Sequence, residues 1–591
     1  MSILDTFFKA LWAVILFAYA IIIFRSCGKR SYDHAMHKYP CEPIPGRQIE
    51  ARNLLITRRT EGGFFMKRII SLILCLAMLT GLSSVAFAEE PVTLKVMFYT
   101  NALTKDFNNV AFIQNMAKEA NVNLEIEQIS SGWDEIKSTL LASGDIPDLI
   151  IGKDAIMNSD IAQFKELFAD MSGLIDEYAP NIRTAFNAHP EMEYLALSED
   201  GGIYGLPKYQ RYWPKTYLRQ MMNVQWLKNL NLEVPTTLDE LYNVLLAFKE
   251  NDANGDGDPN NEIPFDFAAG VASGSVYQIP WALTMLCGYG VPVTAITDSG
   301  WYLSNGEVKN IYMSDEYKDL IQFLAKCWAA GLINTEIFTE DYATFAATSR
   351  TGVVGYTFGW DISDRMGSGE LAEQYEVIAP ILPSADYADK AVWETSYYTL
   401  NYACPTAVMS AACENKEAAM RFLNLFYSDT YGIQVLFGSL GDCIADNGDG
   451  SFSVLPPADS SMDPGTWKWT NAHADSGCLY ISDDVQLNLP TDMQIINTLD
   501  EVYAPYVEHV GNDMWPGAFL KYNDEDNSEL AFYMTDLKNL FETTFASWLT
   551  AGAPDNDAWE AYKQSANAAG YEEARAIVQK AVDAYFAYVG K

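Results

Sequence analysis

The sequence is poor in basic side chains and in histidine. It holds 39 Lys and Arg against 78 Asp and Glu, a formal net charge of −39. Such a surface repels nucleic acid, so we expect no nucleic-acid partner. The 5 histidines show no metal-ligand spacing, and the chain lacks both a Gly-x-Ser-x-Gly motif and a phosphate-binding loop. No residue set indicates a catalytic centre, and we predict that the protein is not an enzyme.

An export signal is present, but it begins at Met66. Met66-Lys67-Arg68 supplies basic charge, residues 69–82 are apolar, and Ala86-Phe87-Ala88 is a small-x-small cleavage site. We expect a signal peptide at 66–88 and export to the extracellular face of the cell membrane or the cell-wall space. Residues 1–65, with an apolar segment at 7–24, are interpreted as an extension upstream of the natural start. A genuine membrane anchor is the alternative.

The exported part is more acidic still and contains few cysteines. Without residues 1–88 the chain keeps 28 basic and 73 acidic side chains, a net charge of −45. Six of the nine cysteines remain, and no two form a Cys-x-x-Cys pair. Export permits disulfides, but the spacing leaves disulfides and buried thiols equally open.

Strand and helix patterns alternate at the start of the exported part. Residues 93–99, 123–129 and 148–151 are typical of strands, and 107–120 and 133–142 are typical of helices. This order predicts a parallel sheet with helices on its faces. Further helices are predicted at 160–178, 416–427, 530–549 and 559–589. Thr237 to Glu240 is a capping box, and turns are expected at Asn305-Gly306 and at 446–450.

Several stretches carry a family resemblance. They are Leu140–Asp148, Gly202–Pro207, Asn223–Leu241 with its continuation to Asp252, Gly355–Trp360 and Ala379–Pro383. Their order resembles the family 1 extracellular solute-binding proteins of bacterial ABC transporters, and the long-chain branch that takes up oligosaccharides fits best. The resemblance implies an α/β, two-lobed, periplasmic-binding-protein-like (type II) clamp with hinge crossovers and a helical C-terminal region.

The resemblance also implies boundaries and partners. Lobe 1 is expected at 89–212 with part of 385–591, and lobe 2 at 213–384 with part of the C-terminal helices. The expected function is capture of an oligosaccharide by hinge closure, without chemical change, by a monomer that delivers it to the transmembrane subunits of an ABC permease. A secreted glycan-active enzyme and a static carbohydrate-binding surface protein are the alternatives.

The segment 252–262 has the oxygen-ligand spacing of a calcium loop. Gly257 permits the turn, and the closing Glu262 stands at position 11 rather than at the EF-hand position 12. The resembling family often carries such a loop here, so we predict a structural Ca²⁺ site. A solvated turn is the alternative, and Asn261 is an alternative to Asn260. The candidate ligands are Asp252, Asn254, Asp256, Asp258, Asn260 and Glu262.

Residues 201–232 form a basic island without any Asp or Glu. Its side chains either bind the carboxylates of a uronic-acid sugar or pair with acids elsewhere in the fold. The members are Lys208, Arg211, Lys215, Arg219 and Lys228.

Aromatic residues follow several predicted strands, where ligands of open α/β sheets bind. Trp and Tyr stack on sugar rings, although each of them taken alone is also a normal core residue. By resemblance, Lys153, Asp154, Trp281 and Trp360 line the sugar cleft, whereas Trp226 is predicted to be core. The predicted ligand contacts are Tyr99, Lys153, Asp154, Lys208, Tyr209, Arg211, Trp213, Tyr277, Trp281, Trp360, Asp361, Trp393 and Tyr397.

Overall fold

The computed structural model describes residues 90–269, 279–294, 300–367, 369–394, 396–459, 462, 464–489 and 498–590. The predicted signal peptide, the apolar segment 7–24 and Tyr277 lie outside the described residues. Among the helices described, none combines the length and apolar character that crossing a membrane requires.

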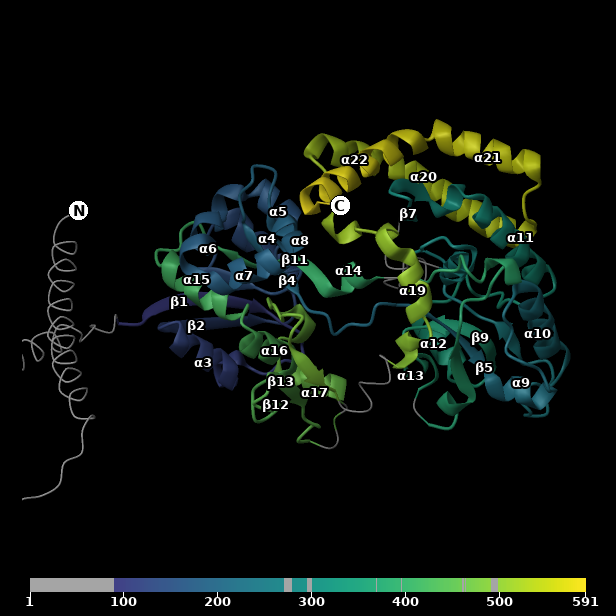
Figure 1. Cartoon of the computed structure of the whole chain (residues 1–591), viewed down its shortest axis with the longest axis horizontal. Coiled ribbons are helices and arrows are strands. Elements are labelled where there is room, and N and C mark those ends of the chain that lie inside the picture. The colour runs from purple at the N-terminus through teal and green to yellow at the C-terminus, as the bar shows by residue number, and fades with distance from the viewer. Residues whose placement is uncertain are drawn as a thin grey trace, which may run out of the picture. The chain divides into compact units, whose positions relative to one another are not determined.

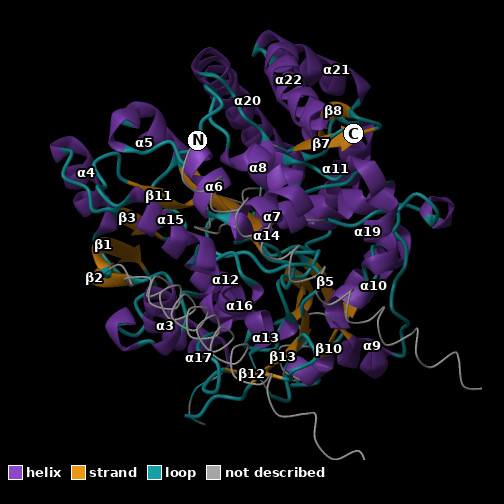
Figure 2. Ribbon diagram, turned by 60° about the vertical axis from the view of Figure 1, so that its left-hand side comes forward, coloured by secondary structure: helices purple, strands orange, loops and turns teal. Residues whose placement is uncertain are grey.

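The first lobe is built on a five-stranded sheet with the order β2-β1-β3-β11-β4. β1 pairs in parallel with β2 and β3, whereas β11 runs antiparallel to β3 and β4. Leu94, Val96 and Phe98 pack into one apolar cluster and Met97 into another, so helices cover both faces of the sheet (Figure 2). The strands are β1 (Val92–Tyr99), β2 (Val122–Ile129), β3 (Leu149–Ile151), β4 (Gly205–Tyr209) and β11 (Tyr402–Met409).

Helices of the first lobe come from two distant parts of the chain. α3 and α15 contact each other beside the sheet, although about half of the described chain separates them (Figure 1). The helices are α3 (Ala111–Glu119), α4 (Trp133–Ser143), α5 (Asn158–Gln163), α6 (Ser172–Tyr178), α7 (Pro180–Ala188), α8 (Pro190–Ala196), α15 (Lys416–Leu425), α16 (Asp429–Phe437) and α17 (Pro464–Asn471). A small sheet beside them holds β12 (Ile444–Asp446), β13 (Ser451–Val454) and β14 (Gln486–Asn488).

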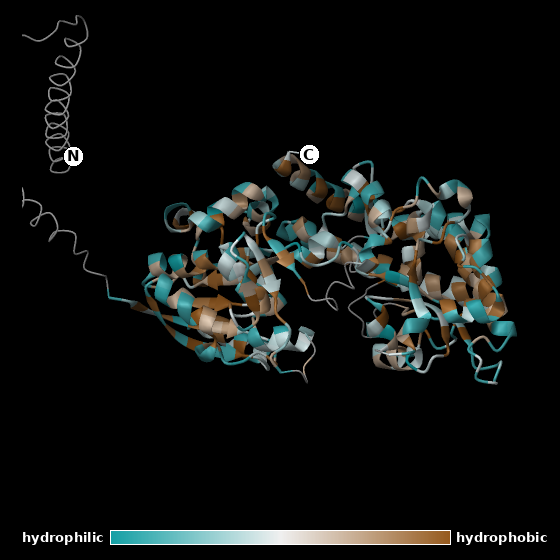
Figure 3. Ribbon diagram, turned by 60° about the horizontal axis from the view of Figure 1, so that its bottom comes forward, coloured by the Kyte–Doolittle hydropathy of each residue, from teal (hydrophilic) through white to brown (hydrophobic). Residues whose placement is uncertain are grey.

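The second lobe is built on a four-stranded sheet with the order β10-β5-β9-β6. β6 and β9 are parallel, and β5 is antiparallel to both β9 and β10. Met222, Phe265, Phe358 and Ile378 of these strands belong to the apolar core of this lobe, and apolar residues are also frequent in the helices around them (Figure 3). The strands are β5 (Arg219–Asn223), β6 (Ile263–Phe265), β9 (Val354–Gly359) and β10 (Tyr375–Ile378). The hairpin of β7 (Trp301–Ser304) and β8 (Glu307–Asn310) lies apart from this sheet.

The helices around this second sheet include the C-terminal ones. α20, α21 and α22 lie together beside α11 (Figure 1). The buried residues Leu537, Phe541, Phe545 and Leu549 recur every four positions along α20 and form the stripe that it buries. The helices are α9 (Val224–Leu230), α10 (Leu238–Glu250), the 3-10 helix η4 (Trp281–Tyr289), α11 (Asp315–Ala329), α12 (Tyr342–Ser349), α13 (Ile362–Met366), α19 (Ala504–Val510), α20 (Asp524–Ala551), α21 (Asn556–Ala568) and α22 (Tyr571–Val589).

Described parts of three segments connect the lobes, and we call them the crossing segments: 210–218, 379–394 with 396–401, and 498–503. The second of these contains the short helix α14 (Tyr397–Asn401). The C-terminal helix also contacts both cores, because Val578 packs in the second lobe and Tyr585 in the first. Tyr585 stacks on Phe519 at 4.9 Å and meets Tyr194 of α8 edge-on at 5.5 Å. The lobes are therefore joined by more than the crossing segments.

Most of the predicted elements are confirmed, and two are wrong: the single helix predicted at 559–589 is two helices, α21 and α22, and the helix predicted at 160–178 is interrupted as well. The capping box at Thr237 and Glu240 forms, Asn305 turns the β7–β8 hairpin with a φ of 54°, and residues 446–450 connect β12 to β13. Trp226 is fully buried, as predicted. The single helix predicted at 160–178 is instead broken into α5, a 3-10 turn and α6. The six cysteines after residue 88 are free thiols.

Candidate functional site

The carboxyl ends of parallel strands mark one edge of each sheet. In the first sheet, β1 and β3 end at Tyr99 and Ile151, and β4 ends at Tyr209. In the second sheet, β6 and β9 end at Phe265 and Gly359. β5 begins opposite the end of β9, since Arg219 pairs with Gly359. The first crossing segment therefore runs between the edges at which α/β proteins bind ligands.

Three half-buried aromatic rings lie together, and we call them the aromatic cluster: Trp213, Tyr217 and Trp360. Trp213 and Tyr217 belong to the first crossing segment, and Trp360 directly follows β9. The ring of Trp360 lies 5.3 Å from that of Trp213 and 4.9 Å from that of Tyr217. The Arg219 guanidinium lies over the Trp360 ring at 5.2 Å, and Arg219 Nη1 donates to the Trp360 carbonyl. Trp360 is thus fixed at its backbone and at its ring, with part of the indole left accessible.

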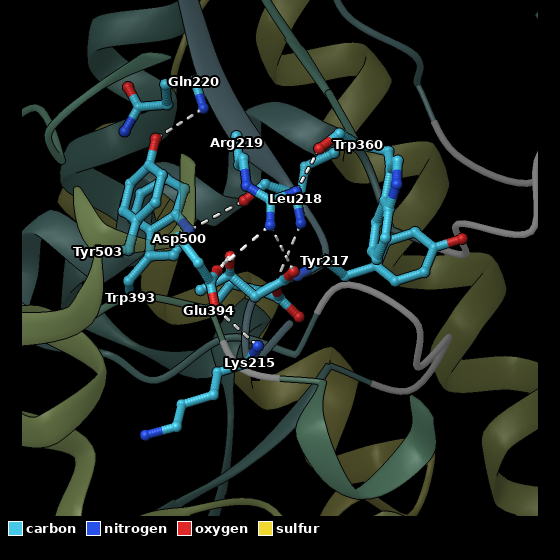
Figure 4. A network of polar contacts seen from close by, with 11 residues as sticks. Lys215, Tyr217, Leu218, Arg219, Gln220, Trp360, Trp393, Glu394, Asp500 and Tyr503 are labelled. Atoms are coloured by element: carbon cyan, nitrogen blue, oxygen red, sulfur yellow. Dashed lines mark hydrogen bonds and ion pairs between the residues drawn. The ribbon is translucent and has the colours of Figure 1, made fainter. Parts of the chain in front are cut away.

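Asp500 holds Arg219 in place from the third crossing segment (Figure 4). Its Oδ1 accepts from Arg219 Nη2 at 3.2 Å and from the Thr216 hydroxyl, and its Oδ2 accepts from the Lys215 main-chain nitrogen at 2.8 Å. The Arg219 side chain is fully buried, while that of Asp500 is 17% exposed. This ion pair joins two crossing segments directly behind the aromatic cluster.

Glu394 makes the equivalent connection to the second crossing segment. Its Oε2 accepts from the main-chain nitrogens of Tyr217 at 2.7 Å and Leu218 at 3.3 Å. The neighbouring Trp393 donates through Nε1 to the Leu218 carbonyl at 2.9 Å and stacks on Tyr503 at 4.4 Å (Figure 4). Two carboxylates and one indole therefore tie the three crossing segments together.

Trp213 is anchored to the first lobe by Asp475. Its Nε1 donates to Asp475 Oδ1 at 2.8 Å, and Asp475 Oδ2 pairs with Lys468 at 2.6 Å. Lys208 is also buried and donates to the Asp475 carbonyl at 2.5 Å. Burial lowers the pKa of Lys208 to about 8, despite the opposing Asp475 carboxylate. Lys208 and Lys468 are therefore both bound by protein atoms.

A second polar group surrounds Tyr209 at the end of β4. The Tyr209 hydroxyl donates to Asp483 Oδ1 at 2.7 Å and lies 3.1 Å from the Tyr397 hydroxyl. Burial raises the pKa of Tyr209, so the phenol stays protonated. His189 Nδ1 lies 3.2 Å from Glu191 and its Nε2 lies 3.7 Å from Asp483. The network fixes Tyr209 as part of the first-lobe core.

A cavity of about 360 Å³ lies beyond the end of β3. Its walls include Lys153, Asp154, Asn158, Leu195, Tyr402 and Pro405. The volume falls at the lower end of the range of small-molecule sites, which is roughly 300–1,000 Å³. The edge of the first sheet thus offers a concave surface of mixed polar and apolar side chains in addition to the aromatic cluster.

The loop 252–262 folds around its own acidic side chains. Asp252 accepts from the main-chain nitrogens of Gly255 at 2.9 Å and Gly257 at 3.0 Å. The amides of Asn254 and Asn261 both donate to Asp256 Oδ2, at 3.1 and 2.6 Å. Glu262 Oε1 accepts from Ala253, whereas its buried Oε2 has no hydrogen-bond partner among the described residues.

This set fits a hard cation in its chemistry, because every side chain that converges offers oxygen. It is not preformed: in the described part of the chain, no group of three His, Cys, Asp or Glu side chains stands ready to hold a metal ion. Asn261 converges on Asp256, whereas Asn260 donates to Asp258 at the rim of the loop.

The sequence profile described as bacterial extracellular solute-binding protein matches residues 104–433. This chain belongs to that family.

Relatives of this solute-binding protein extend over most of its length. The fructooligosaccharide ABC transporter substrate-binding protein FusA of Streptococcus pneumoniae serotype 4 is 28% identical over 524 residues, which are 84% of this chain and 91% of FusA. An HMO-binding, ABC-transporter-associated solute-binding protein of Bifidobacterium longum infantis superposes with a TM-score of 0.73 at 26% identity, covering 84% of this chain and 99% of that one. The complex of FusA with kestose gives a TM-score of 0.67 at 26% identity, with coverage of 84% and 99%. The fold of this solute-binding protein is accordingly the two-lobed type II architecture.

The structure separates the predicted ligand residues into two groups. Eight of the predicted residues are at least partly accessible at the strand ends or crossing segments: Tyr99, Lys153, Asp154, Arg211, Trp213, Trp360, Asp361 and Tyr397. Trp213 and Trp360 come together in the aromatic cluster, and Lys153 and Asp154 line the cavity.

Four other predicted residues have buried side chains in this structure: Lys208, Tyr209, Trp281 and Trp393. Trp281 packs against Phe345 at 5.3 Å, and Trp393 stacks on Tyr503 at 4.4 Å. Lys208 Nζ donates to the Asp475 carbonyl, and the Tyr209 hydroxyl donates to Asp483 Oδ1.

Sequence reasoning missed four residues of this site: Tyr217, Glu394, Asp475 and Asp500. Each is a single polar or aromatic residue without a flanking motif, and the tertiary fold alone brings them together. Lys468, between Trp467 and Trp469, did carry a signal, since a lysine flanked by two tryptophans is unusual in so acidic a chain.

Proposed function

We propose that this protein is the extracellular substrate-binding component of an ABC importer and that it captures an oligosaccharide between its lobes. The observation that carries this proposal is the aromatic cluster at the first crossing segment. Partly accessible Trp and Tyr rings are the side chains on which sugar rings stack. FusA, which is named for fructooligosaccharide transport, supports the same class of ligand.

The mechanism we propose is closure without chemistry. Trp213 belongs to the first lobe through Asp475, and Trp360 follows β9 of the second lobe. A ligand that contacts both lobes stabilises the closed arrangement, which a membrane permease then recognises. The polar groups around the cluster bind side chains or main chain, and we assign no nucleophile or general base to them.

We propose a neutral rather than a uronic oligosaccharide. Lys208 donates to the Asp475 carbonyl and Arg211 to the Val485 carbonyl. Arg219 donates to the Asp500 carboxylate and to the Trp360 carbonyl, so protein atoms bind much of the basic island. The alternative finds support in the Bacillus subtilis polygalacturonan/rhamnogalacturonan-binding protein YtcQ, which is 25% identical over 54% of this chain and 61% of its own length.

We propose further that a calcium ion is held by the loop 252–262. The oxygens of Asp252, Asn254, Asp256 and Glu262 would hold it, and Asn261 joins them in place of Asn260. The buried Oε2 of Glu262 supports this assignment. The ion would screen the acidic charge of the loop and fix the connection from α10 to β6. We also propose that the protein acts outside the membrane, as a monomer, beside the transmembrane subunits of the permease.

Isothermal titration calorimetry with kestose, fructo-nystose, a neutral milk tetrasaccharide and trigalacturonate tests the proposal. We expect saturable binding of one of the neutral glycans. Chromatography of the same mixtures after overnight incubation should recover the glycan intact. Release of shorter products, or binding of trigalacturonate alone, would overturn the neutral-transport proposal.

A further inference from the structure

Another polar group, formed by Asp266 and Arg365, lies at the carboxyl edge of the second-lobe sheet and is separate from the aromatic cluster. Asp266 directly follows β6, and Arg365 lies on α13, which begins two residues after Trp360. Because β6 and β9 are parallel, both residues stand at the ligand-binding edge of this sheet. Neither residue takes part in the networks described above.

Both side chains are fully buried and incompletely hydrogen-bonded. Asp266 Oδ1 accepts from Asn334 Nδ2 at 3.1 Å, whereas Oδ2 has no hydrogen-bond partner among the described residues. Arg365 Nη2 donates to Ser349 Oγ at 2.5 Å, whereas Nε and Nη1 make no hydrogen bond within the described part of the chain. Buried polar groups in native proteins are nearly always satisfied. One acceptor and two donors in one place therefore indicate a missing partner.

The surroundings fix the geometry of this group. The Arg365 guanidinium carbon lies 3.4 Å from the centre of the Phe345 ring and 5.9 Å from that of the Trp281 ring. Asn334 connects Asp266 to Glu340, to which its amide donates at 3.4 Å. Asp266 and Arg365 are thus held by rigid neighbours, as a preorganised binding site requires.

The charges around the group discriminate against an anionic ligand. The Arg365 guanidinium faces Asp266, Glu340 and Asp364, and the guanidinium of Arg350 lies beside Asp364 alone, so three carboxyl groups meet two positive charges. Burial raises the pKa of Asp266 to about 6, and burial together with Asp266 raises the pKa of Glu340 to about 7. A further carboxylate would be repelled here, whereas a pair of hydroxyl groups supplies both acceptors and a donor without adding charge.

We propose that Asp266 and Arg365 form a subsite for adjacent hydroxyl groups on one ring of a neutral oligosaccharide. The two hydroxyl oxygens accept from Arg365 Nε and Nη1, and one of the hydroxyl groups donates to Asp266 Oδ2. This inference rests on the proposed function and deepens it, because it names a second point of contact for the neutral oligosaccharide.

Calorimetry on Asp266→Asn and Arg365→Met, with the glycans named above, tests the subsite. The matched control is Glu336→Gln, because Glu336 is exposed and its main-chain nitrogen, not its carboxylate, contacts Asn334. We expect each subsite variant to weaken binding of the best neutral glycan about 30-fold and the control to change it less than about 2-fold.

The outcomes separate the subsite from the function. Wild-type affinity in a folded Asp266→Asn variant overturns the subsite and leaves the transport function standing. Tighter binding of trigalacturonate than of any neutral glycan overturns the uncharged class. If the wild type binds none of the glycans, the function and the subsite both fall. Should Arg365→Met not fold, the isosteric Asp266→Asn variant decides.

Discussion

Replacing Trp360 by alanine is expected to weaken oligosaccharide binding about 60-fold. Trp213, Tyr217 and Arg219 already cover part of the indole. A tryptophan side chain buries roughly 150–250 Å² in full, so we take about 100 Å² for the face left to a sugar ring. At about 25 cal/mol per Å², the lost contact corresponds to about 2.5 kcal/mol.

The assay is calorimetry on the neutral glycan that the wild type binds best, with Trp328→Ala as the matched control. Trp328 is also half-buried, but it lies near the end of α11, whose following residue Ala330 accepts from Lys249 at the end of α10. The control should keep wild-type affinity, and circular dichroism should confirm that both variants are folded.

Equal affinity of Trp360→Ala and the wild type would refute the stacking argument. Equal losses in both tryptophan variants would refute it too, since a loss at Trp328 reports a general effect on the second lobe.

Three further predictions concern the supports of the site. Asp500→Asn leaves the buried Arg219 charge uncompensated. Urea denaturation should therefore show that the free energy of unfolding falls by about 3 kcal/mol, and glycan affinity should fall as well. Unchanged stability would contradict the ion-pair assignment. Burial raises the pKa of Asp266 from 3.8 to about 6 beside Asn334, Arg365 and Glu340, so its ionisation destabilises the fold as the pH rises through 6. The stability of Asp266→Asn relative to wild type should therefore increase between pH 4 and pH 8 by up to about 3 kcal/mol, and a difference independent of pH would contradict this. Calcium at 100 times its Kd should stabilise the wild type by about 2.7 kcal/mol but not Asp252→Ala, with little effect on glycan affinity; an equal shift in both proteins would place the ion elsewhere.

Local sequence patterns were sufficient for much of the fold. The capping box at Thr237 and the turn at Asn305 form as predicted because their hydrogen bonds involve neighbouring residues. The helix predicted at 160–178 was wrong because residues 168–169 instead hydrogen-bond and pair with the end of β11, which pulls the chain out of the helix. Tertiary pairing there overrides the local pattern.

The site was only partly predictable for the same reason. Trp213 and Trp360 were found because each follows a strand end, and the fold then places their rings 5.3 Å apart. Trp281 begins a helix and Trp393 lies in the second crossing segment, and both are core residues. No sequence rule distinguishes a tryptophan at the edge of a sheet from one beneath it, because the difference depends on packing by distant helices and crossing segments. Asp266 and Arg365 are 99 positions apart and carry no joint motif.

Closure of the two lobes on an intact glycan is most directly tested by small-angle X-ray scattering on the exported chain. We predict that the radius of gyration falls when the neutral glycan with the highest calorimetric affinity is added to saturation, and that Trp360→Ala at the same glycan concentration shows a smaller decrease. An unchanged scattering profile at saturation would contradict the account.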